Sequence, residues 1–488
     1  MSLRGADDGE RIRLQPYVPL KESVSWTMAS SYWEHSGASA FFGSAVPFRV
    51  TSDGFLSEKA AEVLFFSLAA AELEDRPESR VIRVLELGAG SGMFARAFLD
   101  SFRLLCQRYR RDFYDRLHYV ATDRAKRMRE DMVRLGVLAQ HEGHFEIAAA
   151  DANQAGFGLN IADGSGTPAP FQAVFLNYVL DILPATVLRI EADRILEVRV
   201  QTSLLPNLLP EGVGPAAAPD WPPDGNLEEF MSVDEFVALL PALAMEYDYV
   251  PVERDLPFES TAAAAADPAR PFLLHSYGAL QCLETCTGLV SPGGFVLVGD
   301  YPCLPFDEEA RVFPWQQYGG SVSMGLNLPL LRTHFRNRSG WRWCEPEEDG
   351  RFLSLRLLGN GVSHALCERF RAVFGKAAFD SLYAPMADAR RHREEGRMRE
   401  ALQSFELAHS RQHRNWGVKT EFAEFLLNDL GETDRALRIA NSGLDDNPIC
   451  PWLWQTVGEC CSRLGRAKDA EEARARARRL AGSPGTNV

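Results

Sequence analysis

A glycine-rich turn directly after an apolar segment constrains the fold of this chain most. Residues 81–87 carry apolar side chains at 81, 82, 84, 85 and 87, which is typical of a parallel strand covered on both faces. Residues 88–92 read Gly-Ala-Gly-Ser-Gly, and residues 93–99 have the apolar spacing of a helix. A strand, a glycine turn and a helix in this order predict a doubly wound α/β sheet with a ligand at the strand's carboxyl end.

The spacing of these glycines separates two classes of cofactor site. A dinucleotide fingerprint reads G-x-G-x-x-G, and its third glycine would fall at Met93, so nicotinamide and flavin binding is disfavoured. The G-x-G-x-G turn after Glu86 instead resembles motif I of the class I S-adenosylmethionine (SAM) dependent methyltransferases. The alternative is an ordinary glycine-rich turn between a strand and a helix. The resemblance implies SAM as cofactor, with Glu86 near its charged end and the turn near its methionyl part, through Gly88, Ala89, Gly90 and Gly92.

Acidic residues end the next two apolar runs. Residues 117–123 read as a second strand that ends at Asp123, where a carboxylate can accept both hydroxyls of an adenosine ribose. The alternative role for Asp123 is to cap the helix expected over 124–135. Residues 145–151 read as a third strand ending in small side chains and Asp151. The resemblance implies that Asp151 binds the adenine amine.

The fourth strand and the loop after it supply the candidates for the reacting edge. Residues 171–177 read as a strand that ends at Asn177, and the resemblance places this edge beside the transferred methyl group. We assign Asn177 to the cofactor, Tyr178 to the substrate and Asp181 to catalysis. Tyr178 as a packing residue and Asp181 as a helix cap remain alternatives.

A general base is not required for methyl transfer, but three residues are candidates for one. If the acceptor is a hydroxyl or a carboxyl, His275, Asp181 or Tyr301 can take its proton, and His275 has the more suitable ordinary pKa. A histidine at the start of a helix, as expected for His275, is alternatively structural.

Further segments extend the resemblance over residues 45–360. Residues 289–301 resemble the family's fifth strand, and 341–344 with 352–358 read as a closing antiparallel pair. Residues 47–53, 177–184 and 299–301 also look like the MidA-type methyltransferases, whose members include protein arginine methyltransferases. Those proteins usually carry Asn-Glu where this chain has Asn177 and Tyr178. No dense acidic pair that could hold a guanidinium is visible in the fourth-strand loop, so no acceptor is assigned.

Between the fourth and fifth strands lies a long insertion, 185–275, which contains many prolines and an alanine run. Connections of this length are commonly functional, and we expect a lid over the active site. Aromatic side chains of the insertion and of the N-terminal segment can wall a substrate pocket, or can simply pack the insertion onto the core. These are Trp26, Tyr32, Trp33, Phe41, Phe42, Trp221 and Phe230.

The C-terminal section repeats itself. Gly396, Gly431 and Gly465 lie 35 and 34 residues apart, and Ala401 with the alanines at 436 and 470 keeps the same offsets. This is the period of tetratricopeptide repeats, which stack helix pairs and present a concave surface. The array can recruit a partner protein, brace the catalytic domain or form a homodimer.

The predicted fold class is therefore α/β, a doubly wound, Rossmann-like, seven-stranded methyltransferase sheet with a C-terminal all-α tetratricopeptide-like repeat domain. We expect an N-terminal cap on the substrate side over 1–75 and the methyltransferase core over 76–360, with the lid at 185–275. A linker is expected over 361–380 and the repeats over 381–482.

Composition restricts the partners. A net charge of −15 argues against nucleic acid, whose binding depends on Lys and Arg. No segment has the ~20 consecutive apolar residues of a membrane helix, and the first residues lack a signal pattern, so we expect a cytoplasmic protein with no membrane partner. Nine scattered cysteines suit a reducing compartment better than a disulfide framework. Cys282 and Cys286 read as core residues of a helix, and no metal site is predicted.

The sequence thus predicts a SAM-dependent methyltransferase of class EC 2.1.1. Direct displacement would carry the methyl group to a nucleophile on a protein, peptide or small molecule. The alternative is a non-catalytic interaction protein, in which a SAM-binding fold serves as a scaffold beside the repeats.

Overall fold

A computed structural model provides the coordinates for this protein. It describes residues 11–42, 49–73, 81–159, 170–191, 194–208, 239–252, 256–267, 271–303, 315–318, 320–336, 338–348 and 353–481. Trp221, Phe230 and most prolines of the expected lid lie outside these residues. Within them, every helix is too short or too polar to cross a bilayer.

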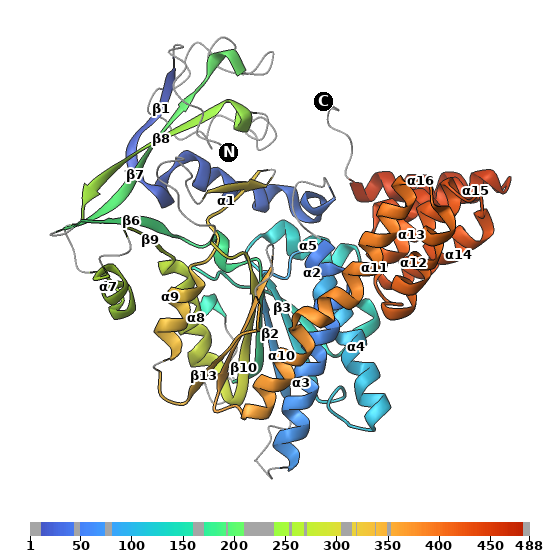
Figure 1. Cartoon of the computed structure of the whole chain (residues 1–488), viewed down its shortest axis with the longest axis horizontal. Coiled ribbons are helices and arrows are strands. Elements are labelled where there is room, and N and C mark those ends of the chain that lie inside the picture. The colour runs from blue at the N-terminus through green and yellow to red at the C-terminus, as the bar shows by residue number, and fades with distance from the viewer. Residues whose placement is uncertain are drawn as a thin grey trace.

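A seven-stranded sheet forms the centre of the molecule (Figure 1), with the order β13-β14-β10-β5-β2-β3-β4. Strands β10, β5, β2, β3 and β4 run parallel, whereas β14 runs antiparallel to both β10 and β13. The mixed α/β sheet and its closing antiparallel pair are confirmed. The strands are β2 (Ile82–Leu87), β3 (Leu117–Asp123), β4 (Phe145–Ala149), β5 (Phe171–Asn177), β10 (Val290–Asp300), β13 (Trp341–Cys344) and β14 (Ser354–Asn360).

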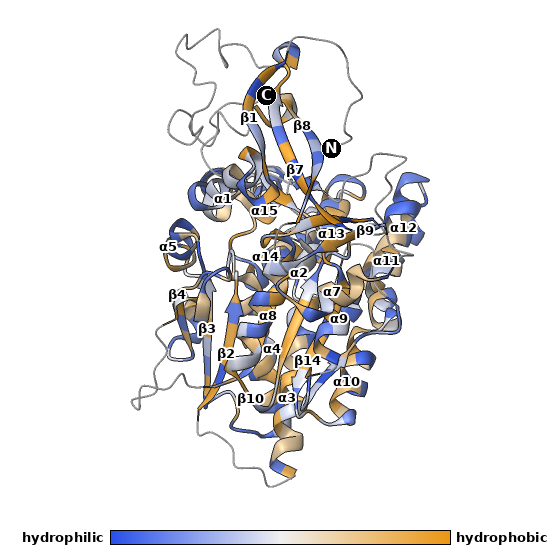
Figure 2. Cartoon of the chain, turned by 90° about the vertical axis from the view of Figure 1, so that its left-hand side faces the viewer, coloured by the Kyte–Doolittle hydropathy of each residue, from blue (hydrophilic) through white to orange (hydrophobic). Residues whose placement is uncertain are grey.

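Both faces of this sheet are covered by helices. Along β2, Ile82 and Val84 belong to one hydrophobic core, whereas Leu85 and Leu87 belong to another. The first core includes side chains of α3 (Phe55–Leu73), α4 (Met93–Tyr109) and α10 (His364–Phe374). The second includes α8 (Tyr277–Leu289) and α9 (Leu328–Arg336). Figure 2 shows the resulting hydrophobic stretches along strands in the middle of the molecule.

The expected lid is largely a second, antiparallel sheet. Strand β7 (Ile195–Leu204) pairs with β1, β6 and β8, and β6 pairs with β9. Alternate side chains of β7 are buried, which gives the sheet a covered face, and Trp26 and Ala29 of α1 (Val24–Ser36) pack on it. The N-terminal segment supplies one strand of this sheet, β1. That the insertion acts as a lid over the active site stays a prediction. The remaining elements are β1 (Ile12–Pro19), β6 (Thr186–Ile190), β8 (Leu243–Pro251), α7 (Glu259–Ala265) and β9 (Phe272–His275).

After the central sheet and α10, six further helices follow in the described residues and lie side by side in Figure 1. Each pair is joined by a turn with a left-handed glycine, at Gly396, Gly431 and Gly465, with φ of 73°, 70° and 72°. The repeated glycines of the sequence thus occupy equivalent turns. The helices are α11 (Lys376–Glu394), α12 (Met398–Arg411), α13 (Trp416–Asn428), α14 (Thr433–Asp446), α15 (Pro451–Arg463) and α16 (Ala467–Ala481).

The expected linker over 361–380 is not a linker. Helix α10 occupies most of it and buries Phe370 and Phe374 in the first core. A disulfide joins Cys344 to Cys367 of α10, a pairing that the sequence did not predict, whereas the other described cysteines form no disulfide. Cys282 and Cys286 are fully buried on α8, in agreement with their prediction as core residues.

Candidate active site

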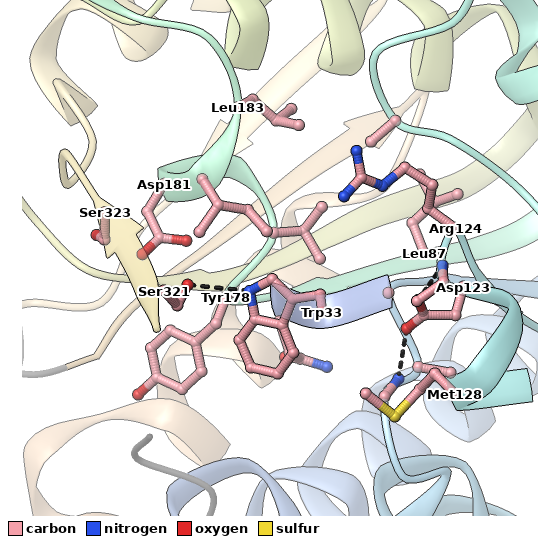
Figure 3. A pocket seen from close by; sticks show the side chains of 18 of the residues that line it. Trp33, Leu87, Asp123, Arg124, Met128, Tyr178, Asp181, Leu183, Ser321 and Ser323 are labelled. Atoms are coloured by element: carbon pink, nitrogen blue, oxygen red, sulfur yellow. Dashed lines mark hydrogen bonds between the residues drawn. The ribbon is translucent and has the colours of Figure 1, made fainter. Parts of the chain in front are cut away.

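A cavity lies at the carboxyl ends of the parallel strands, where the sequence predicts a ligand. Its floor is formed by residues at the ends of β2, β3, β4 and β5. Trp26 and Trp33 of α1, together with Phe41, form part of its wall. In Figure 3, Tyr178 and Asp181 lie on one side of the Trp33 ring and Asp123 on the other. Further lining residues come from α2 (Arg49–Ser52), α5 (Lys126–Arg134), β11 (Gln316–Tyr318) and β12 (Ser321–Ser323).

The glycine turn requires glycine at three of its positions. Gly88 and Gly90 line the cavity with φ of 69° and 55°, a region that L side chains rarely adopt. A Cβ atom on Gly90 would lie 2.8 Å from Cζ of Phe41. Gly92 also has a positive φ, of 77°, but it is not among the lining residues, and its Cβ would meet Met132 of α5. The structure therefore gives Gly92 a packing role, whereas Gly88, Ala89 and Gly90 face the cavity.

Two acids predicted to hold the cofactor meet at this turn. Glu86 is 2% exposed and accepts a hydrogen bond of 2.9 Å from the Tyr119 hydroxyl. Burial raises the pKa of Glu86 to about 8, so the free protein holds this carboxyl largely protonated at neutral pH.

Asp123 lines the cavity and accepts hydrogen bonds from the glycine turn and from the residue before α5. Its Oδ2 accepts from the Gly90 N–H at 3.1 Å and its Oδ1 from the Ala125 N–H at 2.9 Å, just before α5. Burial raises the pKa of Asp123 to about 6 although these hydrogen bonds oppose the shift. Asp151 lies across the same cavity and accepts from the Asn153 N–H at 2.9 Å.

The end of β5 carries unusual backbone geometry and two unsatisfied polar atoms. Tyr178 has φ of 54°, a strained conformation for a non-glycine residue and one that is frequent at functional sites. Among the described residues, Asn177 Nδ2 and Asp181 Oδ1 are buried and have no hydrogen-bond partner. Both residues line the cavity. Since an unsatisfied buried polar atom costs about 1–3 kcal/mol, such atoms indicate a ligand that satisfies them.

Asp181 forms a buried pair with Asp300, the last residue of β10. The backbone N–H of Asp181 donates to Asp300 Oδ2 at 3.3 Å, and the two carboxyls lie close enough for a shared proton to be favoured over two adjacent negative charges. Burial, and then the neighbouring carboxyl, raise the pKa of Asp300 well above its ordinary value, and burial also raises that of Asp181. Asp300 further accepts from the backbone N–H groups of Leu180 at 2.9 Å and Tyr301 at 2.8 Å.

The fourth-strand loop contributes one acid of this pair, Asp181, and the end of β10 contributes the other, Asp300. Asp181 and Asp300 are 119 residues apart, and only the parallel pairing of β5 with β10 brings them together. Their one sequence signal is that Asp300 ends an apolar strand.

Three tyrosines stack along the same wall. The Tyr178 and Tyr301 rings have centroids 4.6 Å apart, and the Tyr301 and Tyr318 rings 5.6 Å apart. Burial raises the pKa of both Tyr178 and Tyr301, so their hydroxyls stay neutral at physiological pH. The Trp33 Nε1–H donates to Ser321 Oγ at 3.0 Å and so joins α1 to β12.

Not all the predicted residues lie here. His275 does not line the cavity; it ends β9 of the second sheet, 3% exposed, with its ring 5.5 Å from that of Tyr277 and 6.3 Å from that of Phe258. The structure thus separates His275 from Asp181 and Tyr301, and we withdraw it as a base. Tyr32 packs on Trp33 and is not among the lining residues, and Phe42 belongs to the first core.

Residues 67–323 match a family described as "Putative S-adenosyl-L-methionine-dependent methyltransferase". No curated protein matches the chain.

Solved structures with a similar fold have low sequence identity. An uncharacterized protein from Burkholderia thailandensis is 15% identical, with 72% of this chain and 89% of that chain covered and a TM-score of 0.41. A second protein from Burkholderia thailandensis, solved with S-adenosyl-homocysteine, is 14% identical over 72% of this chain and 97% of that chain, with a TM-score of 0.41. The N-methyltransferase NodS from Bradyrhizobium japonicum, also solved with S-adenosyl-homocysteine, is 10% identical over 69% of this chain and 99% of that chain, with a TM-score of 0.29.

Proposed function

The chain belongs to this family of SAM-dependent methyltransferases, and we propose that it methylates a nucleophile on a protein, peptide or small molecule by direct displacement, a reaction of class EC 2.1.1. SAM is its cofactor. The proposal extends to the residues that hold the cofactor and to those that face the acceptor.

The lining residues fit SAM chemically. SAM carries two positive charges, on its sulfonium and ammonium groups, and Glu86 and Asp123 place carboxyls beside a turn that lacks side chains at Gly88 and Gly90. We assign Glu86 to the charged end, Asp123 to the ribose and Asp151 to the adenine. The backbone of Gly88, Ala89 and Gly90 would approach the methionyl part, and Asn177 Nδ2 is an unused donor beside it.

The mechanism depends mainly on alignment and exclusion of water. When bound, SAM supplies a methyl group on a positively charged sulfur, which is a good leaving group. Tyr178, Tyr301 and Trp33 wall the acceptor side and keep water out. Asp181 accepts the proton that the acceptor loses, and Asp300 supports it as the second carboxyl of the buried pair.

One observation carries this assignment: Asp181 Oδ1 is buried, lines the cavity and has no partner among the described residues. A scaffold protein would gain nothing from such an unsatisfied carboxylate, so the observation favours an enzyme over the non-catalytic alternative. A buried carboxyl pair also favours a neutral or cationic acceptor over an anionic one. This agrees with the MidA-type likeness, which we retain as part of the proposal.

Binding and transfer are tested separately. Calorimetry should detect binding of SAM and of S-adenosylhomocysteine, and a tritiated-methyl assay against a cell lysate, separated into protein and small-molecule fractions, should show a labelled product. Asp181→Asn should bind SAM as the unmodified protein does but transfer no label. If neither SAM nor its demethylated product binds, the enzyme is excluded and the scaffold alternative stands.

The domain assignment is part of the same proposal. We assign residues 76–360 to the methyltransferase core, with the second sheet inserted, and α11–α16 to tetratricopeptide-like repeats. The equivalent glycine turns support the repeat assignment.

A further inference from the structure

The C-terminal helices contact the two N-terminal segments that wall the cavity. One segment contains Phe41 and Phe42, and the other contains Thr51 and Ser52 of α2. Phe41, Thr51 and Ser52 line the cavity. Both segments therefore connect the candidate cofactor site with helices that begin more than three hundred residues later in the chain.

Trp416 and Asn415, at the start of α13, hold the α2 segment. The indole Nε1–H of Trp416 donates to the Ser52 carbonyl at 2.6 Å, and Trp416 is 1% exposed. Ser52 ends a four-residue helix, whose last carbonyls have no partner within it. Asn415 Nδ2 donates to Asp53 Oδ2 at 3.1 Å. The C-terminal helices thus provide hydrogen-bond donors for the Ser52 carbonyl and the Asp53 carboxyl, at the end of a segment that forms part of the cavity wall.

Trp452 of α15 holds the other segment. Its ring lies parallel to that of Trp416, with centroids 6.4 Å apart, and meets the Phe42 ring edge-on at 6.3 Å. Phe41, which precedes Phe42 in the chain, covers the glycine turn, because its ring lies close to Gly90. A row of ring contacts therefore leads from Trp416 of α13 through Trp452 to Phe42, whose chain neighbour Phe41 lies against the turn.

Polar contacts fix the same helices to α4, which begins at the glycine turn. Arg414 forms an ion pair of 2.7 Å with Asp100 of α4. The Arg96 guanidinium, 8% exposed, donates to the Asp445 carbonyl at 3.0 Å. Three elements around the cavity are thus held by one group of helices.

We infer that the C-terminal helices position the wall of the cofactor cavity, with Trp416 as a positioning residue, so that SAM affinity depends on side chains that do not line the cavity. The inference rests on the proposed function only in naming SAM as the occupant. The competing explanation is that the helices stabilise the fold without any specific effect on the cavity.

The test compares two tryptophans with the same kind of hydrogen bond. Trp416→Phe removes the donor to Ser52 and keeps an aromatic ring. Trp454→Phe is the matched control, because its indole donates at 2.9 Å to the Pro448 carbonyl within the C-terminal helices. We expect Trp416→Phe to raise the Kd for SAM about 5- to 10-fold, as the loss of one buried hydrogen bond predicts, and Trp454→Phe to leave it within about twofold.

A second measurement needs no ligand. Hydrogen exchange at residues 49–56 should be faster in ligand-free Trp416→Phe than in either the unmodified protein or Trp454→Phe. Asn415→Ser is the substitute variant if Trp416→Phe fails to fold. A serine can still cap α13 but cannot reach Asp53, so this variant should also weaken SAM binding and speed exchange at residues 49–56.

The outcomes separate this inference from the proposed function. Equal effects of the two tryptophan variants on SAM affinity, or unchanged exchange at residues 49–56, overturn the positioning role. If the unmodified protein binds no SAM, the proposed function fails, and the exchange measurement still decides whether the helices hold the wall.

Discussion

At the scale of single residues, Glu86 makes cofactor binding depend on pH. Burial raises its pKa to about 8 in the free protein, and a bound cation would favour the ionised form and lower this pKa. SAM binding then releases a proton, so the Kd for SAM should fall as pH rises towards about 8 and level off above it. For the titration of one group, the Kd for SAM cannot change by more than tenfold per pH unit, which corresponds to about 1.4 kcal/mol of binding free energy.

Calorimetry over a range of about pH 6 to 9 measures this slope. Glu86→Gln keeps the shape of the side chain but cannot ionise, so its SAM affinity should vary less with pH than that of the unmodified protein. Equal slopes for the two proteins would place the titrating group elsewhere.

Asp123 is the residue on which the ribose assignment depends. Asp123→Ala should weaken SAM binding by about 1–3 kcal/mol, because it removes a charged acceptor and also the hydrogen bond from the Gly90 N–H. Calorimetry with SAM checks this expectation. An affinity equal to that of the unmodified protein would remove Asp123 from the site.

The sequence predicts which residues line the cavity when they lie at the ends of strands of the parallel sheet, whereas their roles stay predictions. Glu86, Asp123, Asn177 and their turn residues face the cavity because strand ends share one edge. His275 also ends a strand, but β9 belongs to the second sheet. The sequence around His275 does not show to which sheet its strand belongs, so the wrong placement of His275 in the site could not be recognised from the sequence alone.

At the scale of elements, the turn between β2 and α4 should tolerate no side chain at position 90. Gly90→Ala would force an alanine into a φ of 55° and against Phe41, and we expect SAM affinity to fall at least about tenfold, or ~1.4 kcal/mol. Gly143→Ala is the control, since Gly143 has φ of 85° but nothing within 4 Å of a Cβ. It should cost stability without affecting SAM binding, which thermal unfolding and calorimetry can separate.

Asp53, just before α3, links two helices through a titratable group. Burial raises its pKa to about 7 from an ordinary 3.8, so the native state binds this proton more tightly than the unfolded state. The contribution of Asp53 to stability is therefore present below pH 3.8, decreases as pH rises and is lost above about 7. The shift of about 3 units sets an upper bound of about 4 kcal/mol.

Urea unfolding at several pH values tests this with Asp53→Asn. The variant cannot titrate at this position, so its stability relative to the unmodified protein should improve as pH rises between about 4 and 7. A constant difference between the two proteins over this range would contradict the assignment.

Elements with local signals were predicted with nearly correct bounds, and elements that need distant partners were not. The run 117–123 matches β3 residue for residue. By contrast, β1 and β7 pair over nearly two hundred intervening residues, as Ile12 with Leu204 shows. The alternation of Leu196, Val198 and Val200 in β7 is readable in the sequence, but it does not reveal which strand pairs with it. Helix α10 was missed because its amphipathic pattern lies between two segments assigned to other domains.

At the scale of the whole molecule, one hydrophobic core extends from the sheet into the last helices. The same cluster contains Phe98 of α4, Trp416 of α13 and Leu480 of α16. We therefore expect scanning calorimetry to show a single unfolding transition for the full chain, moved as a whole to higher temperature by a bound ligand. Two resolved transitions, of which only one responds to S-adenosylhomocysteine, would show that the helices fold independently.

The hydrogen bond between Trp416 and Ser52 joins residues 364 positions apart. During synthesis on the ribosome, every predicted catalytic side chain has emerged well before this tryptophan. A nascent or C-terminally shortened chain would therefore carry the complete set of reacting groups without the support of its cavity wall. Full affinity for the methyl donor would arise only after the helices around Trp416 have emerged and packed on the rest of the chain.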